Sequence, residues 1–157
     1  LLIIPAGKAL GGQGALILSN TDIINHLVET ARPYLFSTAP APAMACALSQ
    51  ALHCLQQQPE HHARLQQNIQ YFNALAAEAG LPVLPSQSAI HALMAGGNEN
   101  ALHMAERLRE RGFWLSAIRP PTVPQGKARL RITLTALHER EHIERLVETL
   151  HAIGVRP

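Results

Sequence analysis

The chain has 157 residues, of which 47% are apolar and 15% are charged, and its formal net charge is +2. A chain of this length and composition can bury a core, which argues against intrinsic disorder. The balanced charge does not indicate a nucleic-acid or membrane-surface partner, and no apolar run approaches the ~20 residues of a membrane span. The two cysteines, Cys46 and Cys54, are not in a CxxC arrangement, which favours free thiols in a reducing cytoplasm.

The first 18 residues predict a pair of strands. Residues 1–4 are an apolar run closed by Pro5, which is typical of a buried strand, and residues 15–18 read as a second strand. The connection at residues 6–14 is rich in glycine, as in a hairpin turn. The chain begins with Leu1 rather than Met, inside the first strand pattern and without signal-peptide features, so we expect a fragment of a longer protein.

Helices dominate the next part of the chain. Asn20 or Thr21 can cap a helix over residues 22–31, whose aliphatic side chains lie on one side. Residues 32–43 contain prolines, so we expect an extended crossing segment there and no regular helix. Two further helices are predicted at residues 43–57 and 60–79.

Strands and helices alternate from residue 81 onward. The expected elements are a strand at 88–95, a helix at 98–111, strands at 113–118 and 128–134, and a last helix to about residue 153. Asn98 and Thr135 are the expected N-caps of these two helices. The last strand alternates apolar and polar residues, with Arg129 and Arg131 on its polar face. This order predicts an α+β layer, an antiparallel sheet of about three strands with helices on one face.

Lys8 is the first candidate for chemistry. It lies in the glycine-rich turn after the first strand, where glycines let the backbone and a planar ligand approach closely. A lysine with little bulk around it can form a Schiff base. The alternative, which the local pattern alone favours, is a solvent-facing turn lysine. A phosphate loop is not indicated, because Ala9 follows where that motif needs Ser or Thr.

Arg129 and Arg131 are the second candidate. A proline-rich loop at residues 119–124 precedes their strand, and both side chains are expected on the sheet face opposite the helices. A guanidinium fixed on a rigid strand suits bidentate binding of a carboxylate. The alternative is that both arginines cover the sheet with their stems and keep their charged heads in water.

A zinc motif of the H-E-x-x-H type occurs at residues 138–142, with His138 and His142 as potential ligands and Glu139 as a potential general base. A catalytic zinc needs a third protein ligand. Arg145 stands where the extended motif has a helix-breaking glycine, and few residues follow. We therefore expect a solvated helix face and no metal site.

The remaining histidines and the larger aromatic residues carry no motif. Trp114 and Tyr34 are expected in the core or at an interface. The other histidines are expected at the surface, and they stand at positions 26, 53, 61, 62, 91, 103 and 151.

Three segments together resemble the α-oxoamine synthases, which are pyridoxal-phosphate (PLP) enzymes of fold type I. Residues 7–15 (GKALGGQGA) resemble the segment that carries their Schiff-base lysine, and residues 31–42 (ARPYLFSTAPAP) resemble their crossing segment. Residues 118–138, which begin IRPPTVP, are similar to the branch that condenses L-alanine with a pimeloyl thioester in biotin biosynthesis. The double-proline loop is the most specific piece, and the resemblance runs over essentially the whole chain.

The resemblance implies roles for five residues. Lys8 holds PLP as a Schiff base and removes the α-proton of the amino acid. Arg131 binds the amino-acid carboxylate, and Thr122 contacts the substrate. Ser37 and Thr38 reach the cofactor phosphate of the neighbouring subunit in a homodimer. The acyl donor is pimeloyl-CoA or a pimeloyl-carrier protein, and carbon dioxide is lost.

The resemblance also implies that residues 1–42 end the large PLP-binding domain and that residues 43–157 form the small C-terminal domain. Two departures lead us to expect an inactive fragment that binds PLP weakly. Pro5 stands where the family usually has a phosphate-binding threonine. The chain also resembles only about the last two fifths of a family chain, and its only aspartate, Asp22, falls in the first turn of a helix, so no carboxylate is left for the pyridinium nitrogen. The alternatives are a non-catalytic fold or dimerisation module from a truncated or decayed gene, a glycine-using member of the family, and a zinc hydrolase through His138, Glu139 and His142.

Overall fold

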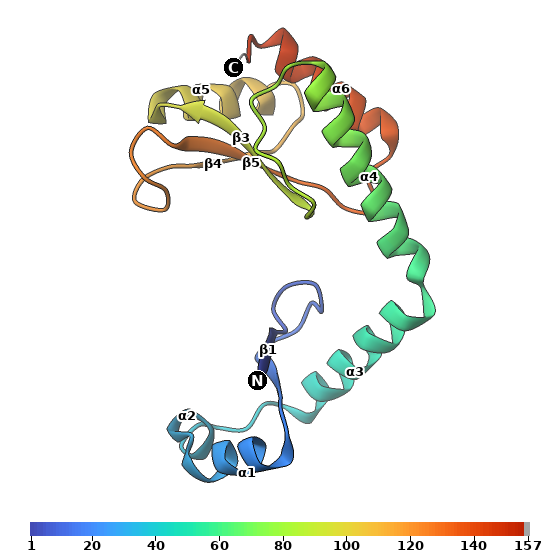
Figure 1. Ribbon diagram of the computed structural model, residues 1–157, viewed down its shortest axis with the longest axis vertical. Coiled ribbons are helices and arrows are strands. Elements are labelled where there is room, and N and C mark those ends of the chain that lie inside the picture. The colour runs from blue at the N-terminus through green and yellow to red at the C-terminus, as the bar shows by residue number, and fades with distance from the viewer. Residues whose placement is uncertain (156–157) are drawn as a thin grey trace. The chain divides into compact units, whose positions relative to one another are not determined.

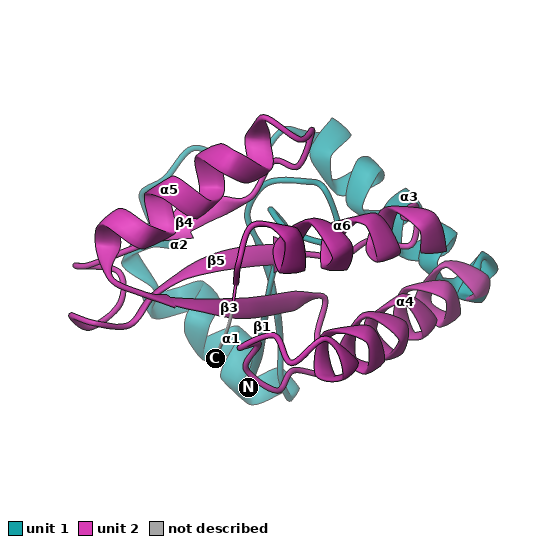
Figure 2. Cartoon of the chain, turned by 90° about the horizontal axis from the view of Figure 1, so that it is seen from above, with its two compact units in different colours: residues 1–59 teal, residues 60–157 magenta. Residues whose placement is uncertain are grey.

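The computed structural model describes residues 1–155 and divides the chain into two compact units, Leu1–Pro59 and Glu60–Pro157 (Figure 2). The first unit begins with the expected strand pair. Strands β1 (Leu2–Pro5) and β2 (Ala15–Leu18) pair in antiparallel fashion, which confirms the hairpin.

Three helices complete the first unit. Helix α1 (Thr21–Thr30) is capped by Asn20, whose side-chain oxygen accepts the N–H of Ile23 at 3.0 Å. Helices α2 (Arg32–Leu35) and α3 (Pro42–Gln57) follow. Within residues 1–155, no helix combines the length and the apolar run needed to cross a membrane.

The expectation of an extended segment without regular helix over residues 32–43 is wrong, because α2 and the start of α3 lie within it. Pro33 and Pro42 each occupy one of the first two positions of a helix. A backbone N–H at these positions has no acceptor within the helix, so proline removes no hydrogen bond there.

The first unit has almost no core of its own. Only Ala6 and Leu48 are buried among residues 1–59. Large apolar side chains are exposed throughout the unit, namely Leu1, Leu2, Ile3, Ile17, Leu18, Ile23, Val28, Tyr34, Leu35, Phe36, Leu52 and Leu55. A two-stranded sheet with so little buried surface is marginal in water by itself.

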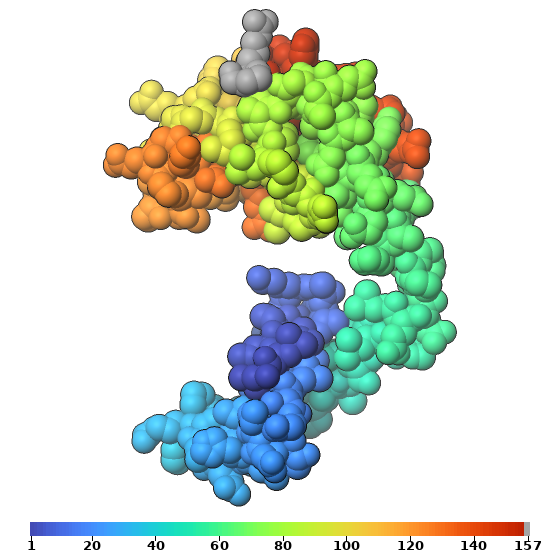
Figure 3. Space-filling model, viewed as in Figure 1, coloured from blue at the N-terminus to red at the C-terminus, as the bar shows by residue number. Residues whose placement is uncertain are grey.

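The second unit is the predicted α+β layer. Its elements are α4 (Pro59–Glu78), β3 (Ile90–Gly96), α5 (Asn98–Arg109), β4 (Ser116–Ile118), β5 (Ala128–Thr133) and α6 (Arg140–Ala152). The strand order is β3-β5-β4 and both pairings are antiparallel. The three helices lie on one face of this sheet (Figure 1), which confirms the predicted layer. The loop between β4 and β5 projects at the edge of the unit, in orange in Figure 3.

The core of the second unit forms between β5 and the helices. Leu130, Ile132 and Leu134 are buried, whereas Arg131 and Thr133 are exposed, so the predicted alternation is confirmed. The apolar face of β5 belongs to one cluster with residues of α4, α5 and α6. Burying each such aliphatic side chain contributes about 1.5–3 kcal/mol.

Two expected helix caps are wrong. The N-cap of α5 is Gly97, without a side-chain bond, and Asn98 is the first helical residue. The N-cap of α6 is Glu139 rather than Thr135, whose hydroxyl instead accepts the N–H of Leu137 in the preceding turn. In addition, the strand expected at residues 113–118 is shorter and begins at Ser116.

His91 is the exception among the histidines expected at the surface. It lies on β3, is fully buried, and neither ring nitrogen has a hydrogen-bond partner in the described structure. Its ring packs 4.8 Å from that of Phe72 on α4. Burial lowers the pKa of His91, because a charged imidazole would lose its hydration in this apolar core.

We expect the stability of the second unit to fall as the pH drops below about 6.5, the value for an unperturbed histidine. The unfolded chain binds a proton at His91 before the folded chain does, so stability is full above this pH and is lost below it, by at most about 1.4 kcal/mol per pH unit. Urea unfolding, followed by the NMR signals of β5 amides from pH 8 to 5, measures this slope. His91→Leu should reduce the slope and the exposed control His103→Leu should not; equal slopes in both variants would contradict this assignment.

Candidate functional site

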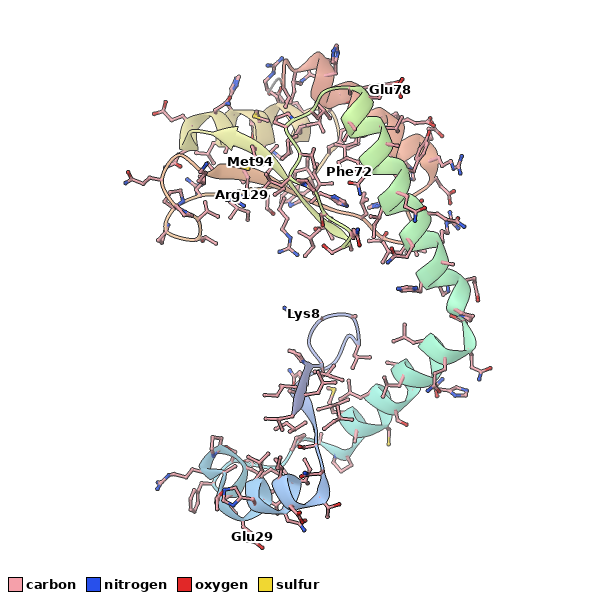
Figure 4. All side chains as sticks on the ribbon, in the orientation of Figure 1. Lys8, Glu29, Phe72, Glu78, Met94 and Arg129 are labelled. Carbon is pink, nitrogen blue, oxygen red and sulfur yellow. The ribbon has the colours of Figure 1, made fainter. Side chains whose placement is uncertain are left out.

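Lys8 lies on the loop between β1 and β2 (Figure 4), and the loop backbone is well defined by hydrogen bonds. The N–H of Ala6 donates to the carbonyl of Gly14 at 2.9 Å, and the N–H of Gly12 donates to the carbonyl of Ala6 at 2.9 Å. The carbonyl of Lys8 accepts the N–H of Gly11 at 3.0 Å. Gly11 and Gly14 have φ values of +65° and +82°, which other residues rarely adopt.

Helix α3 packs closely against this loop. A Cβ atom at Gly12 would lie 2.5 Å from Cδ2 of Leu48, the one buried side chain of α3. The N–H of Gln13 also donates to the Met44 sulfur at 3.3 Å. The loop is therefore fixed from one side by α3, while the Lys8 side chain is exposed and forms no ion pair within residues 1–155.

Ser37 and Thr38 lie directly after α2, in a stretch without regular structure. Both are exposed, and neither makes a hydrogen bond to another described residue. Their hydroxyls are therefore accessible to a partner, and their role toward a cofactor phosphate stays a prediction.

Arg131 lies on the sheet face that the helices leave uncovered. Its cross-strand neighbours are Ala92 on β3 and Ser116 on β4, both small. The guanidinium therefore projects from between short side chains, into a hollow of about 240 Å³ that Trp114 and Thr133 also line. No carboxylate lines this hollow, so it suits an anionic ligand.

Arg129 lies on the same face but in different surroundings. Its cross-strand neighbours are Met94 and Ile118, and its Nε–H donates to the carbonyl of Lys127 at 3.0 Å. Arg129 is half-buried and does not line the hollow of Arg131. Of the two candidate arginines, the structure thus leaves Arg131 available to a ligand.

Thr122 lies in the loop between β4 and β5, after a cis peptide bond between Pro120 and Pro121. Its N–H donates to the carbonyl of Arg119 at 3.0 Å, which closes a turn. Thr122 is exposed and is not among the residues that line the Arg131 hollow. Its contact with a substrate therefore stays a prediction.

Trp114 belongs to this site although the sequence favoured a core or interface role. It is 82% exposed and lines the Arg131 hollow. The sequence pattern placed Trp114 within a strand at residues 113–118, but β4 begins only at Ser116. Two residues before a strand, the side chain no longer follows the alternation of the sheet.

The H-E-x-x-H motif has a structural role. The Nδ1 atom of His142 accepts the N–H of Glu139 at 3.1 Å, and the Glu139 side chain accepts the N–H of His142 in return. This reciprocal pair is a capping box that starts α6. His138 lies before the helix, so the two histidines are not one helical turn apart as a zinc helix requires.

Side chains of α4 hold the turn that carries His138 in place. Its Nδ1 atom accepts the N–H of Thr135 at 3.2 Å, and the buried amide of Asn68 donates to the carbonyls of Thr135 and His138 at 3.0 and 2.8 Å. Arg64 forms an ion pair with Glu139 at 2.5 Å. Burial, with a smaller contribution from the charge of His142, lowers the pKa of His138 and favours its neutral ring.

We expect His142→Ala to lower the free energy of unfolding of the second unit by about 1 kcal/mol, as loss of an N-terminal cap does. Urea unfolding at pH 7.5, followed by the NMR signals of α6 amides, measures the change. His103→Ala on the exposed side of α5 is the matched control and should change stability by less than about 0.5 kcal/mol. A His142→Ala chain as stable as the control would show that the imidazole does not cap α6.

Comparison with known proteins defines the class of this chain. The family model of class I and II aminotransferases matches residues 5–150. The chain belongs to this family, which agrees with the fold and with a lysine placed on a glycine-rich loop after a strand.

The more specific likeness is to 8-amino-7-oxononanoate synthase. The enzyme of that name from Serratia proteamaculans (strain 568) is 50% identical over 155 residues, which make up 99% of this chain and 40% of the relative. The one from Cronobacter sakazakii (strain ATCC BAA-894) is 48% identical over 96% of this chain and 39% of the relative. The predicted resemblance is therefore confirmed, and the chain spans about two fifths of the length of the curated relatives it matches.

Solved structures give the same result. The crystal structure of 8-amino-7-oxononanoate synthase from Francisella tularensis has a TM-score of 0.85 and 30% identity, over 96% of this chain and 44% of that one. A serine palmitoyltransferase structure with PLP has a TM-score of 0.88 and 25% identity, over 97% of this chain and 39% of that one. The fold is thus that of a part of a fold-type I PLP enzyme.

Proposed function

We propose that this chain is the C-terminal part of a PLP-dependent acyltransferase that makes 8-amino-7-oxononanoate for biotin biosynthesis. The reaction joins L-alanine to a pimeloyl thioester, either pimeloyl-CoA or a pimeloyl-carrier protein, and releases carbon dioxide. The observation that carries this proposal is the Lys8 loop, a rigid glycine-rich turn with an exposed amine, in a chain 50% identical to a synthase of that name.

The residues of the chain fit part of a PLP site. The Lys8 amine is exposed at a loop of small residues, which suits a covalent anchor for a planar ring. PLP would supply an electron sink for the carbanion at the α-carbon of the amino acid. Lys8 would also accept the α-proton, and Arg131 would hold the alanine carboxylate until it leaves as carbon dioxide.

The remaining steps are acyl transfer to the α-carbon, loss of carbon dioxide and return of a proton. The α-carbon forms a bond to the acyl carbon, the carbon–sulfur bond breaks, and the carrier thiol leaves with a proton. Loss of carbon dioxide follows, and the amine of Lys8 returns a proton to the α-carbon. Lys8 would therefore transfer protons at the α-carbon and Arg131 would bind the carboxylate, with Thr122 as a further contact.

Other groups of the complete site would come from outside this chain. Asp22, the only aspartate, is exposed in the first turn of α1, and Pro5 offers no hydrogen-bond donor. We infer that the isolated chain does not catalyse the reaction and binds PLP weakly. Ser37 and Thr38 would serve the PLP phosphate of a neighbouring subunit in a cytoplasmic homodimer, without nucleic-acid or membrane partners.

The domain division of the complete enzyme follows from the same proposal. Residues 1–42 would end the large domain, and residues 43–157 would form the small C-terminal domain. The apolar side chains that residues 1–42 leave exposed support a large-domain origin for this segment, since a piece of a larger domain exposes side chains that the rest of that domain covers. The compact unit of the structure itself extends further, to Pro59.

The second candidate is a non-catalytic module from a truncated or decayed gene. Pro5 is the observation that favours it, because proline has no N–H and no hydroxyl to offer a phosphate at this position. The two candidates differ in whether the chain can complete a working site when the rest of the fold is supplied.

A chimera tests this difference. We expect residues 1–155 of this chain, substituted for the matched segment of the Serratia proteamaculans synthase, to give an enzyme with measurable synthase activity and the visible absorbance of lysine-bound PLP. Lys8→Ala should abolish both, because no other amine of the loop can form the covalent bond. Activity is measured with L-alanine and pimeloyl-CoA.

The Pro5→Thr version of the chimera is the control for the second candidate. If the chimera is inactive and Pro5→Thr restores activity, the chain is a decayed synthase. If absorbance and activity persist in the Lys8→Ala chimera, Lys8 is not the anchor and the proposed function is wrong.

Arg131 and Arg129 offer a matched pair of substitutions on one strand face. In an active chimera, we expect Arg131→Met to raise the KM for alanine at least tenfold, because it removes a charge-assisted bond worth about 1.5–3 kcal/mol. Arg129→Met should leave this KM within about twofold, since Arg129 does not line the hollow. Equal effects of the two substitutions would show that Arg131 does not bind the alanine carboxylate.

A further inference from the structure

A second cavity lies in the second unit, between β5 and the first turns of α6. Its volume is about 430 Å³. Seven of the twelve residues that line it are apolar, namely Phe113, Trp114, Leu115, Ile132, Leu134, Ile143 and Leu146. We propose that this cavity binds a small carboxylate carried on an apolar body, such as an aliphatic acid.

The polar part of the lining consists mainly of donors. His138, His142 and Arg145 all line the cavity. Each histidine uses Nδ1 to accept a backbone N–H, at 3.2 Å for His138 and 3.1 Å for His142. A neutral imidazole that accepts at Nδ1 carries its proton on Nε2, so both rings keep one donor for a ligand.

The charge of the cavity is positive. Arg145 contributes a guanidinium, which lies 5.8 Å from the centre of the Phe113 ring and is held over it. No carboxylate is among the residues that line the cavity. Glu139, which adjoins His138 in the chain, is already paired with Arg64. A ligand carboxylate would therefore meet one guanidinium and two imidazole donors without a competing anion.

The cavity differs from the hollow around Arg131. The two share Trp114, Leu115 and Thr133 on their border, but Arg131 lines only the hollow and Arg145 only the cavity. Carboxylate binding here is therefore separate from the proposed acyltransferase reaction and does not depend on it.

Trp114 gives a direct signal for the test. It is the only tryptophan of the chain, it is exposed, and it lines the cavity. We expect sodium hexanoate to change its fluorescence and to shift the NMR signals of His142 in the chain of residues 1–157. Hexanol, which has the same carbon chain without a charge, should bind at least tenfold more weakly.

Three substitutions locate the binding. Arg145→Met should weaken hexanoate binding at least tenfold. Arg140→Met, on the same helix but against Tyr71 and outside the cavity, and Arg131→Met should both change it less than twofold. Circular dichroism of each variant confirms that it is folded.

Four results would overturn the site. Binding lost in Arg131→Met but kept in Arg145→Met would place hexanoate in the other hollow. Equal binding of hexanol, or equal binding by every variant, would mean adsorption to exposed apolar surface such as that of the first unit. Unchanged fluorescence and unchanged His142 signals at 50 mM hexanoate would mean that the cavity binds no carboxylate.

Discussion

The second unit depends on strand β5, because the two faces of this strand have opposite chemistry. Leu130 and Ile132 fill the core beneath the helices, whereas Arg129 and Arg131 lie on the open face. A slip of one residue in its pairing would bury guanidinium groups and expose the aliphatic side chains. Because β5 is the central strand, its register is fixed by β3 on one side and β4 on the other. The packing that folds the unit therefore also orients Arg131.

Small neighbours make the two candidate groups of the site accessible, each within its own unit. Arg131 is flanked by Ala92 and Ser116, and Lys8 stands in a loop of glycines that α3 approaches closely at Gly12. In both places a long, charged side chain projects from a backbone segment that hydrogen bonds hold. Such an arrangement limits the conformational entropy that the backbone loses when a ligand binds.

Much of the fold could be predicted from periodicity. The alternation in β5 and the helical spacing in α4 report local burial, so the order of strands and helices in the second unit was predicted correctly. The short helix α2 was missed because Pro33 lies in its first turn, where proline is tolerated, whereas the prediction treated proline as a helix breaker. The cap of α6 was missed because Glu139 and His142 replace the usual hydroxyl and carboxylate of a capping box.

The site itself was only partly accessible to sequence reasoning. The residue types of Lys8 and Arg131 suggested chemistry, but which arginine is available depends on cross-strand neighbours far away in the sequence. The burial of His91 could have been predicted from the sequence. His91, Leu93 and Ala95 are two residues apart along β3, so they lie on the same, buried face of the strand. The hollow that Trp114 lines could not be predicted in this way, because it depends on β4 beginning at Ser116, and the sequence pattern does not fix that boundary.

The exposed apolar side chains of residues 1–59 also bear on how this polypeptide behaves in a cell. Chaperones and proteases act on chains that expose apolar surface which a finished domain would hide. A ribosome product consisting of these residues alone would present such segments from β1 through α3. A partner that covers this surface would therefore protect the chain from such proteases.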